Sequence, residues 1–416
     1  MKLSKHKLGE LIEVTRGASL SGQFYAEEGE LIRLTLGNFN MNGGGFKENT
    51  SKTDLYYTGT VKDEFILNKG DIITPLTEQS LGLLGTTARI PEKGKYIQSQ
   101  DVALVKCKEG LLDPNFCYYL ISSSIVRQQL SAGAQQTKIR HTSPDKIKDC
   151  TVWVPEFEEQ KRIGRILTDI DEKITLNRQI NDNLEAMAKQ LYDYWFVQFD
   201  FPNEEGKPYK SSGGAMVWNE KLKREIPKGW SGVSLKDLAV TSRNAITPVE
   251  NEVYQHFSIP SFDACGSYSL DNGSDIKSDK FVLQEGQLLV SKLNPWFNRV
   301  VWVPRGTNII GSTEFVVLNP NNKSESGYIY SVIKSPKFVA YCSQAATGTS
   351  HSQRRVSPDV LMAFKVAYEP GVVQKYGCFM ENIQKRQAEL LSETATLTKQ
   401  RNEFLPLLMN GQISIQ

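Results

Sequence analysis

Several signatures of membrane, metal-binding and nucleotide-binding proteins are missing from this chain of 416 residues. The six cysteines form no Cys-x-x-Cys pair and the four histidines do not cluster with them, so no zinc-type ligand set is predicted. No uncharged apolar run approaches the roughly 18 residues that a membrane span requires. The first residues contain no apolar signal region. These absences favour reduced, structural cysteines in a cytoplasmic protein.

Signatures of nucleotide chemistry are missing as well. The sequence contains no Gly-x-x-x-x-Gly-Lys-Ser/Thr phosphate loop and no Gly-x-Gly-x-x-Gly after an expected strand. The formal net charge is only +2, which excludes a polycation. If the protein binds nucleic acid, the affinity must come from a local arrangement of lysine and arginine side chains.

The main feature that the chain does contain is an internal repeat with a period of about 215 residues. Three segments recur in the same order: Lys7–Leu11 with a loose copy in Ser234–Leu238, Phe65–Gly70 in Phe281–Gly286, and Ser143–Asp145 in Ser357–Asp359. A duplicated unit predicts a pseudo-twofold molecule, and such a molecule suits a partner with twofold character of its own. Duplex DNA is the leading candidate for that partner.

The pattern of elements predicts an α+β protein with two similar globular α/β-mixed stretches, each followed by one long helix. The expected segments are a globular stretch at 1–157, a long helix at 158–197, a linker rich in turn residues at 198–232, a second globular stretch at 233–370, and a second long helix at 371–416. Within the first globular stretch, helical spacing also predicts one helix from Pro114 to about Leu130. In the last helix we expect a kink at Pro406 and an end at Asn410-Gly411.

Apolar residues at heptad spacing mark one face of each long helix. They are Ile163, Leu167, Ile170, Ile174, Leu184 and Leu191 in the first helix, and Met380, Ile383, Leu390, Leu397 and Phe404 in the second. Polar residues interrupt this seam at Asn177 and Asn181, and at Gln387, Thr394 and Arg401. Matching seams predict an antiparallel coiled coil in which the polar stretches meet. In the alternative, each helix packs only on its own globular stretch.

The helices and the linker carry motifs that resemble a known family. These motifs are 155–163, 171–177 and 183–188 in the first helix, 208–214 and 226–230 in the linker, and 400–411 in the last helix. Together they resemble the conserved regions of type I restriction-modification system specificity subunits. The globular stretches share only the overall layout of that family, because these domains diverge widely within it.

The resemblance implies a division of labour between subunits. Each globular stretch would be a target recognition domain that reads one half of a bipartite, asymmetric DNA site. The paired helices would set the spacer and dock two modification subunits, which bind S-adenosylmethionine and methylate adenine at N6. Restriction subunits would use ATP and Mg²⁺ to cleave unmethylated DNA. The specificity subunit itself would bind no cofactor or metal and would have no catalytic residue.

Two motifs leave an enzymatic alternative open. Asn294-Pro295-Trp296-Phe297 differs by one residue from the Asn-Pro-Pro-Phe motif of amino-methyltransferases, but the sequence lacks their Phe-x-Gly-x-Gly loop. Pro144-Asp145 followed by Glu159-Gln160-Lys161 loosely matches metal-dependent nucleases, but the repeated Ser-Pro-Asp has no such Glu-x-Lys. A third class is a coiled-coil scaffold without any nucleic-acid role.

Candidate DNA contacts are polar or basic residues in two kinds of loop, because such side chains reach base edges and phosphates. The first kind precedes each Ser-Pro-Asp, and the second follows the strand after each repeated Phe–Gly segment. In the first half the candidates are Gln79, Gln136, Lys138 and Arg140. In the second half they are Lys292, Asn294, Asn298, Arg299, Gln353, Arg354 and Arg355.

Overall fold

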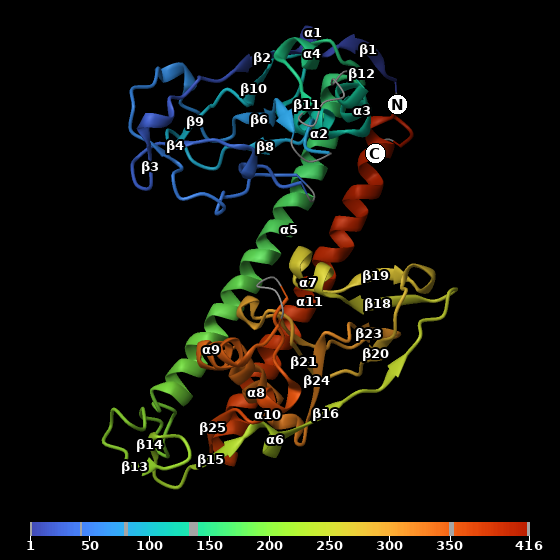
Figure 1. The fold of residues 1–416 in the computed structure, drawn as a ribbon. Coiled ribbons are helices and arrows are strands. Elements are labelled where there is room, and N and C mark those ends of the chain that lie inside the picture. The colour runs from blue at the N-terminus through green and yellow to red at the C-terminus, as the bar shows by residue number, and fades with distance from the viewer. Residues whose placement is uncertain (1, 42–43, 79–81, 133–139, 349–352, 414–416) are drawn as a thin grey trace. The chain divides into compact units, whose positions relative to one another are not determined.

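The computed structural model describes residues 2–41, 44–78, 82–132, 140–348 and 353–413. The chain forms two compact units, one of residues 1–175 with 395–416 and the other of residues 176–394. Both unit boundaries fall inside the long helices α5 (Phe157–Tyr192) and α11 (Pro370–Met409), which are green and red in Figure 1. Each unit therefore contains a part of both helices.

The first unit is built on an antiparallel sheet of strand order β2-β10-β6-β8. These strands are β2 (Ile12–Arg16), β10 (Val102–Cys107), β6 (Ile72–Pro75) and β8 (Ala88–Arg89). A smaller sheet has the order β3-β5-β4-β9, with β3 (Tyr25–Ala26), β5 (Tyr56–Tyr57), β4 (Ile32–Arg33) and β9 (Tyr96–Ile97). Strand β1 (Ser4–Lys7) pairs with β12 (Thr151–Val154), and β7 (Thr77–Glu78) pairs with β11 (Arg140–His141). The helices before α5 are α1 (Leu8–Leu11), α2 (Pro114–Ser122), α3 (Ser124–Ala132) and α4 (Pro144–Lys148).

The second unit repeats this design. Its main sheet has the order β16-β24-β21-β22, with β16 (Ala239–Ser242), β24 (Phe315–Pro320), β21 (Leu288–Ser291) and β22 (Val300–Trp302). A five-stranded sheet contains β17 (Ala245–Ile246), β20 (Lys280–Val282), β23 (Ile309–Gly311), β18 (Val253–Phe257) and β19 (Ser269–Asn272). Strand β15 (Ser231–Ser234) pairs with β25 (Lys365–Tyr368). The helices before α11 are α6 (Leu235–Leu238), α7 (Ile259–Cys265), α8 (Ser326–Lys334), α9 (Pro336–Ala345) and α10 (Pro358–Met362).

The internal repeat is thus a repeat of topology as well as of sequence. In both units a strand, a four-residue helix and a second strand come first, and the second strand begins the main sheet. A helix pair follows that sheet, then a short helix, then a strand that pairs back with the first one, then a long helix. Between the repeats lies a hairpin of β13 (Met216–Asn219) and β14 (Arg224–Pro227).

Local chemistry explains the repeated motifs. The hydroxyls of Ser143 and Ser357 cap α4 and α10 by accepting backbone N–H groups, and the following proline occupies the first helical position. The repeated glycines Gly70 and Gly286 have φ values of 90° and 86°, a left-handed conformation that glycine adopts without strain. These motifs therefore form turns that occur at equivalent places in the two units, and their residues have a structural role.

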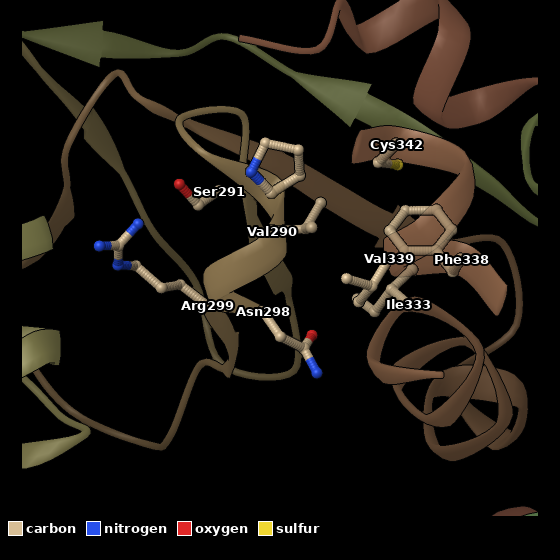
Figure 2. A pocket seen from close by; sticks show the side chains of 9 residues that line it. Val290, Ser291, Asn298, Arg299, Ile333, Phe338, Val339 and Cys342 are labelled. Atoms are coloured by element: carbon tan, nitrogen blue, oxygen red, sulfur yellow. The ribbon is translucent and has the colours of Figure 1, made fainter. Parts of the chain in front are cut away.

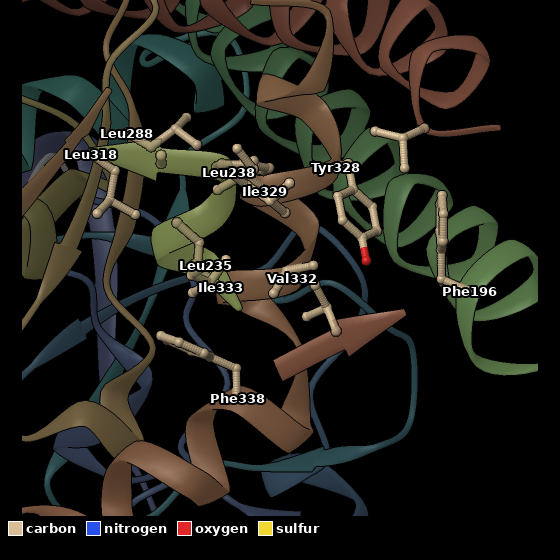
Figure 3. Close-up of a cluster of buried hydrophobic side chains, with 14 of the residues drawn as sticks. Phe196, Leu235, Leu238, Leu288, Leu318, Tyr328, Ile329, Val332, Ile333 and Phe338 are labelled. Carbon is tan, nitrogen blue, oxygen red and sulfur yellow. The ribbon is translucent and has the colours of Figure 1, made fainter. Parts of the chain in front are cut away.

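Each unit has a hydrophobic core that includes residues of both long helices. In the second unit, Phe196 of the turn after α5 contacts Tyr328 of α8, with ring centroids 4.6 Å apart (Figure 3). The ring of Tyr376 of α11 lies 5.1 Å from the same phenylalanine. In the first unit, Ile163 and Leu167 of α5 join the same buried cluster as Leu408 of α11. Burying a side chain of this size contributes roughly 1.5–3 kcal/mol to the free energy of unfolding. Both helices therefore help to stabilise each unit.

Polar contacts fix how the helices pair. In the second unit the Asn177 amide donates to Glu393 at 2.8 Å, and the Gln387 amide donates to Glu185 at 3.4 Å. Because contacts nearer the C-terminus of α5 reach residues nearer the N-terminus of α11, the helices run antiparallel. In the first unit, Arg401 of α11 binds Asp171 of α5 at 2.8 Å. The predicted fold class and antiparallel helix pairing are confirmed.

Two local expectations were wrong and a third was confirmed. The predicted helix from Pro114 to Leu130 is divided into α2 and α3, because Ser123 adopts an extended backbone with ψ of 156°. Helix α11 continues through Pro406 to Met409, and the chain leaves it at Gly411 with φ of 67°, so the expected end at Asn410-Gly411 is confirmed. Of the predicted seam residues, Phe404 is 40% exposed, whereas Arg401 is buried because Asp171 pairs with it. The other ten seam residues are buried or half-buried.

A glycine at the eighth position of each long helix permits close packing that the sequence analysis missed. A Cβ atom at Gly164 would lie 2.7 Å from the backbone nitrogen of Phe116 at the start of α2. At Gly377 it would collide with the backbone carbonyl oxygen of Ser324, just before α8. The two glycines are 213 residues apart and occupy equivalent places in the repeat.

We predict that Gly164→Ala and Gly377→Ala lower the free energy of unfolding by about 1–3 kcal/mol, because the backbone must move to admit a methyl group. The control is Gly371→Ala in the first turn of α11, where the new methyl group would meet only the Glu369 side chain. That variant should be neutral or slightly stabilising. Denaturant titration measures all three, and equal midpoints would contradict the packing argument.

Candidate nucleic-acid interface

Two of the predicted loop segments meet in the first unit. Strand β7 follows the main-sheet strand β6, and it pairs with β11, which directly precedes the Ser143 cap. In this ribbon Glu78 lies opposite Arg140, and Thr77 lies opposite His141. The Thr77 hydroxyl lies 3.2 Å from Nδ1 of His141 and donates to Asp101 at 3.0 Å. The structure therefore brings together residues that are more than sixty positions apart in the sequence.

Glu78 is a buried residue of this ribbon and is only 2% exposed. Its Oε2 accepts hydrogen bonds from the backbone N–H groups of Gly82, Leu83 and Leu84 at 3.1, 3.0 and 3.0 Å. Its Oε1 lies 3.7 Å from the guanidinium of Arg140, whose side chain is 32% exposed. One buried carboxylate thus holds the backbone of residues 82–84 and lies beside a cation at the surface.

The second unit has an equivalent ribbon with different side chains. Leu293 forms a bridge with Arg355, and the Asn294 N–H donates to the Arg354 carbonyl at 2.7 Å. The Arg354 N–H in turn donates to the Asn294 side-chain oxygen at 3.0 Å. Asn294 occupies the place of Glu78, and Arg354 occupies the place of Arg140. Both predicted loops of the second half therefore meet as those of the first half do.

Cationic side chains border the second ribbon. Gln353 and Arg355 are exposed, and Lys292 and Arg354 are half-buried. Arg355 makes a two-pronged ion pair with Glu314, with Nε and Nη2 each 3.0 Å from a carboxylate oxygen. Hydrogen bonding to Glu314 raises the pKa of Arg355 above its ordinary value, so this arginine stays charged.

Asn298 and Arg299 brace the turn after β21 instead of facing solvent. Asn294 and Asn298 both have φ of 49°, in the left-handed region that asparagine tolerates. The Asn298 amide donates to the Lys334 carbonyl at 3.1 Å. Arg299 is 7% exposed and binds both oxygens of Asp263, at 2.6 and 2.8 Å. A direct contact of Arg299 with DNA would require breaking this pair, so its position favours a supporting role.

The candidate residues Gln79, Gln136 and Lys138 lie outside the described residues. Glu78 and His141 lie within the candidate loops of the first half, although neither was selected as a single DNA contact. A signal for Glu78 was available, because it is the repeat equivalent of Asn294, which was a candidate.

A small cavity lies behind the turn of the second unit (Figure 2). Ser291, Asn298, Phe338 and Cys342 are among its lining residues, and its volume of about 10 Å³ has room for about one water molecule. The buried Oδ1 of Asn298 has no hydrogen-bond partner among the described residues, which suits such a water. This cavity is far too small for an extruded base, and the Asn294 amide oxygen is occupied by Arg354. The methyltransferase-like motif therefore forms a structural turn.

The nuclease-like motif is also engaged in local helix contacts. Asp145 pairs with Lys148 at 2.7 Å in the first turns of α4, and Lys161 pairs with Glu158 at 2.8 Å in α5. Glu159 binds Arg162 at 3.3 Å. The described residues contain no group of three histidine, cysteine or acidic side chains that could hold a metal ion.

Comparison with known proteins shows what the chain is similar to. Residues 2–186 match the family described as the type I restriction modification DNA specificity domain. The type I restriction enzyme MjaIX specificity subunit of Methanocaldococcus jannaschii is 22% identical over 326 residues, which cover 74% of this chain and 71% of that protein. The HindI specificity subunit of Haemophilus influenzae is 29% identical over 107 residues, 25% of this chain and 23% of that protein.

The fold agrees with this class. The crystal structure of a type I restriction-modification system S subunit from M. genitalium matches with a TM-score of 0.59, covering 98% of this chain and 96% of that one at 15% sequence identity. The resemblance carried by the helix and linker motifs is thus confirmed, and the chain is a relative of type I restriction-modification specificity subunits.

Among the described residues, no helix is both long and apolar enough to cross a membrane.

We predict that Arg299→Ala lowers the free energy of unfolding by about 1.5–3 kcal/mol, since it removes charged hydrogen bonds from a buried guanidinium. Arg355→Ala is the matched control, because the Arg355 side chain is 45% exposed. Losing that surface pair should cost less than about 1 kcal/mol. Chemical denaturation of both variants tests the assignment. If Arg299→Ala were as stable as Arg355→Ala, the supporting role of Arg299 would be disproved.

Proposed function

We propose that the chain is the DNA-recognition subunit of a type I restriction-modification complex. Each globular domain reads one half of a bipartite, asymmetric DNA site. The observation that carries this proposal is the repeated ribbon. Both units present the turn after a main-sheet strand beside the segment before Ser-Pro-Asp, but with Glu78 and Arg140 in one and Asn294 and Arg354 in the other. A common frame with different side chains is what two unequal half-sites require.

The remaining parts of the complex are assigned to other proteins. We propose that the paired helices set the spacer between the half-sites and dock two modification subunits, which use S-adenosylmethionine to methylate adenine at N6. Restriction subunits use ATP and Mg²⁺ to cleave unmethylated DNA. The chain acts in the cytoplasm without a catalytic residue of its own. The local bonding of Asn294, Asp145 and Lys161 supports the non-catalytic assignment.

The two ribbons should read different halves of the site. We predict that Arg140→Ala relaxes base preference in one half and Arg354→Ala relaxes it in the other, each by about 1–3 kcal/mol at the affected position. Selection of random duplex DNA by the full chain, followed by sequencing, measures the preference at each position. Lys223→Ala removes one cation from the β13–β14 hairpin and serves as the charge-matched control. If both arginine variants lost base preference at positions throughout the whole site, the assignment of one half-site to each unit would be refuted.

The helices should act as a ruler. Inserting seven residues after Asn181 and seven after Leu390 keeps the heptad register and lengthens the pair by about 10 Å. Both insertions lie between the contacts of Asn177 with Glu393 and of Glu185 with Gln387. We predict that the preferred spacer grows by about three base pairs, given 3.4 Å per base pair. An insertion in α5 alone is the control and should weaken binding at every spacer length. If the preferred spacer length were unchanged in the double insertion, the helices would not act as a ruler.

A further inference from the structure

Two large aromatic side chains are exposed at the second ribbon. Trp296 and Phe297 occupy the 3₁₀ turn η6 (Pro295–Phe297), and they are 41% and 58% exposed. Their ring centroids lie 6.1 Å apart, so they form one continuous apolar surface. Aromatic side chains are mostly buried in folded proteins, and neighbouring exposed rings commonly mark a contact surface.

The turn that carries these rings is rigidly held. It is bounded by the left-handed residues Asn294 and Asn298, which are tied to Arg354 and to the Lys334 carbonyl. The Arg299 guanidinium lies 4.5 Å from the ring centre of Phe297 and is itself fixed by Asp263. In Figure 2, Asn298 and Arg299 leave the turn in different directions, so it is anchored on two sides. Rings held in this way lose little conformational entropy when they bind a partner.

The surroundings of the rings are suited to a polyanion. Lys292 precedes the turn by three residues, and the backbone of Arg354 is bonded to Asn294, the residue directly before the turn. These cations favour phosphates, whereas flat aromatic rings favour the faces of bases. The corresponding stretch of the first half, residues 79–84, reads Gln-Ser-Leu-Gly-Leu-Leu and contains no aromatic residue. The feature therefore belongs to one unit only.

We propose that Trp296 and Phe297 form an aromatic wedge that partly unstacks one base step in the half-site read by the second unit. This inference rests on the proposed function. Insertion of apolar side chains unstacks and kinks duplex DNA at a cost of a few kcal/mol. Pyrimidine–purine steps deform most readily, so the wedge adds sequence preference at a step where no hydrogen bond reads the bases. A single contact with a thymine methyl group would use far less aromatic surface than these two rings offer.

The test uses the full chain and a duplex carrying the selected site, with 2-aminopurine placed in turn at each purine of the second half-site. The wild-type chain should raise the fluorescence at one step, because unstacking relieves quenching. Trp296→Ala and Phe297→Ala should abolish that rise and weaken specific binding about 5- to 150-fold, the range for lost aromatic–base stacking. The salt dependence of binding should stay unchanged, since no phosphate contact is removed. Lys292→Ala should instead reduce the salt slope by about 0.9.

Trp218→Ala is the matched control, because Trp218 is 58% exposed on the β13–β14 hairpin and should leave both signals intact. Thermal melting of each variant distinguishes loss of the wedge from loss of the fold. A wild-type complex without a fluorescence rise at any position overturns the wedge. The wedge is also overturned if replacing thymine by uracil weakens binding as much as the aromatic substitutions do and no fluorescence rise is seen. That result would indicate a contact with the thymine methyl group. If the wild-type chain binds DNA without sequence preference, the proposed function itself fails.

Discussion

The largest hydrophobic cluster of each unit is incomplete without both long helices, and the rest of the structure depends on this constraint. The core of the second unit takes Ala188, Trp195 and Phe196 from the first long helix and the turn that ends it, and Val373, Tyr376, Met380 and Ile383 from α11. The core of the first unit takes Ile163 and Leu167 from α5, and Leu408 and Met409 from α11. Each half of the sequence therefore supplies part of the other half's core. Pairing of the helices is therefore needed to complete both of these clusters.

The polar residues on the helix seam make this pairing specific at some cost in stability. Asn177 is 1% exposed, and its Oδ1 has no partner among the described residues. An apolar residue there would pack better, but it would tolerate a shifted register. Asp171 has a similar role in the first unit, where it accepts bonds from both Arg401 of α11 and Tyr119 of α2. Burial, together with the charge of Asp171, raises the pKa of Tyr119, which keeps the phenol protonated as a donor.

The sequence predicted features that depend on local periodicity. The heptad spacing located both long helices, and α5 and α11 begin within two residues of the expected starts. The repeated Ser-Pro-Asp and Phe–Gly segments indicated the duplicated topology correctly. The division of the helix at Ser123 was not predictable from spacing, because one extended residue between two helical runs leaves the apolar pattern intact.

The candidate interface was predictable only in part. The sequence indicated which loops to consider, and pairing of those loops followed once the strands were placed. It did not reveal that Arg299 is held by Asp263, a residue 36 positions earlier, or that Glu78 is buried beneath its ribbon. Such facts depend on distant parts of the chain. The assignment of individual DNA contacts remains a prediction.

We propose that two unequal domains on one helix pair direct adenine methylation to a split site. Methylome sequencing of cells with and without this chain tests it directly. We expect one adenine-methylated motif that disappears with the chain and consists of two different half-sites around a spacer of unspecified bases. A single uninterrupted motif, or a methylome that does not change when the chain is removed, would contradict the account.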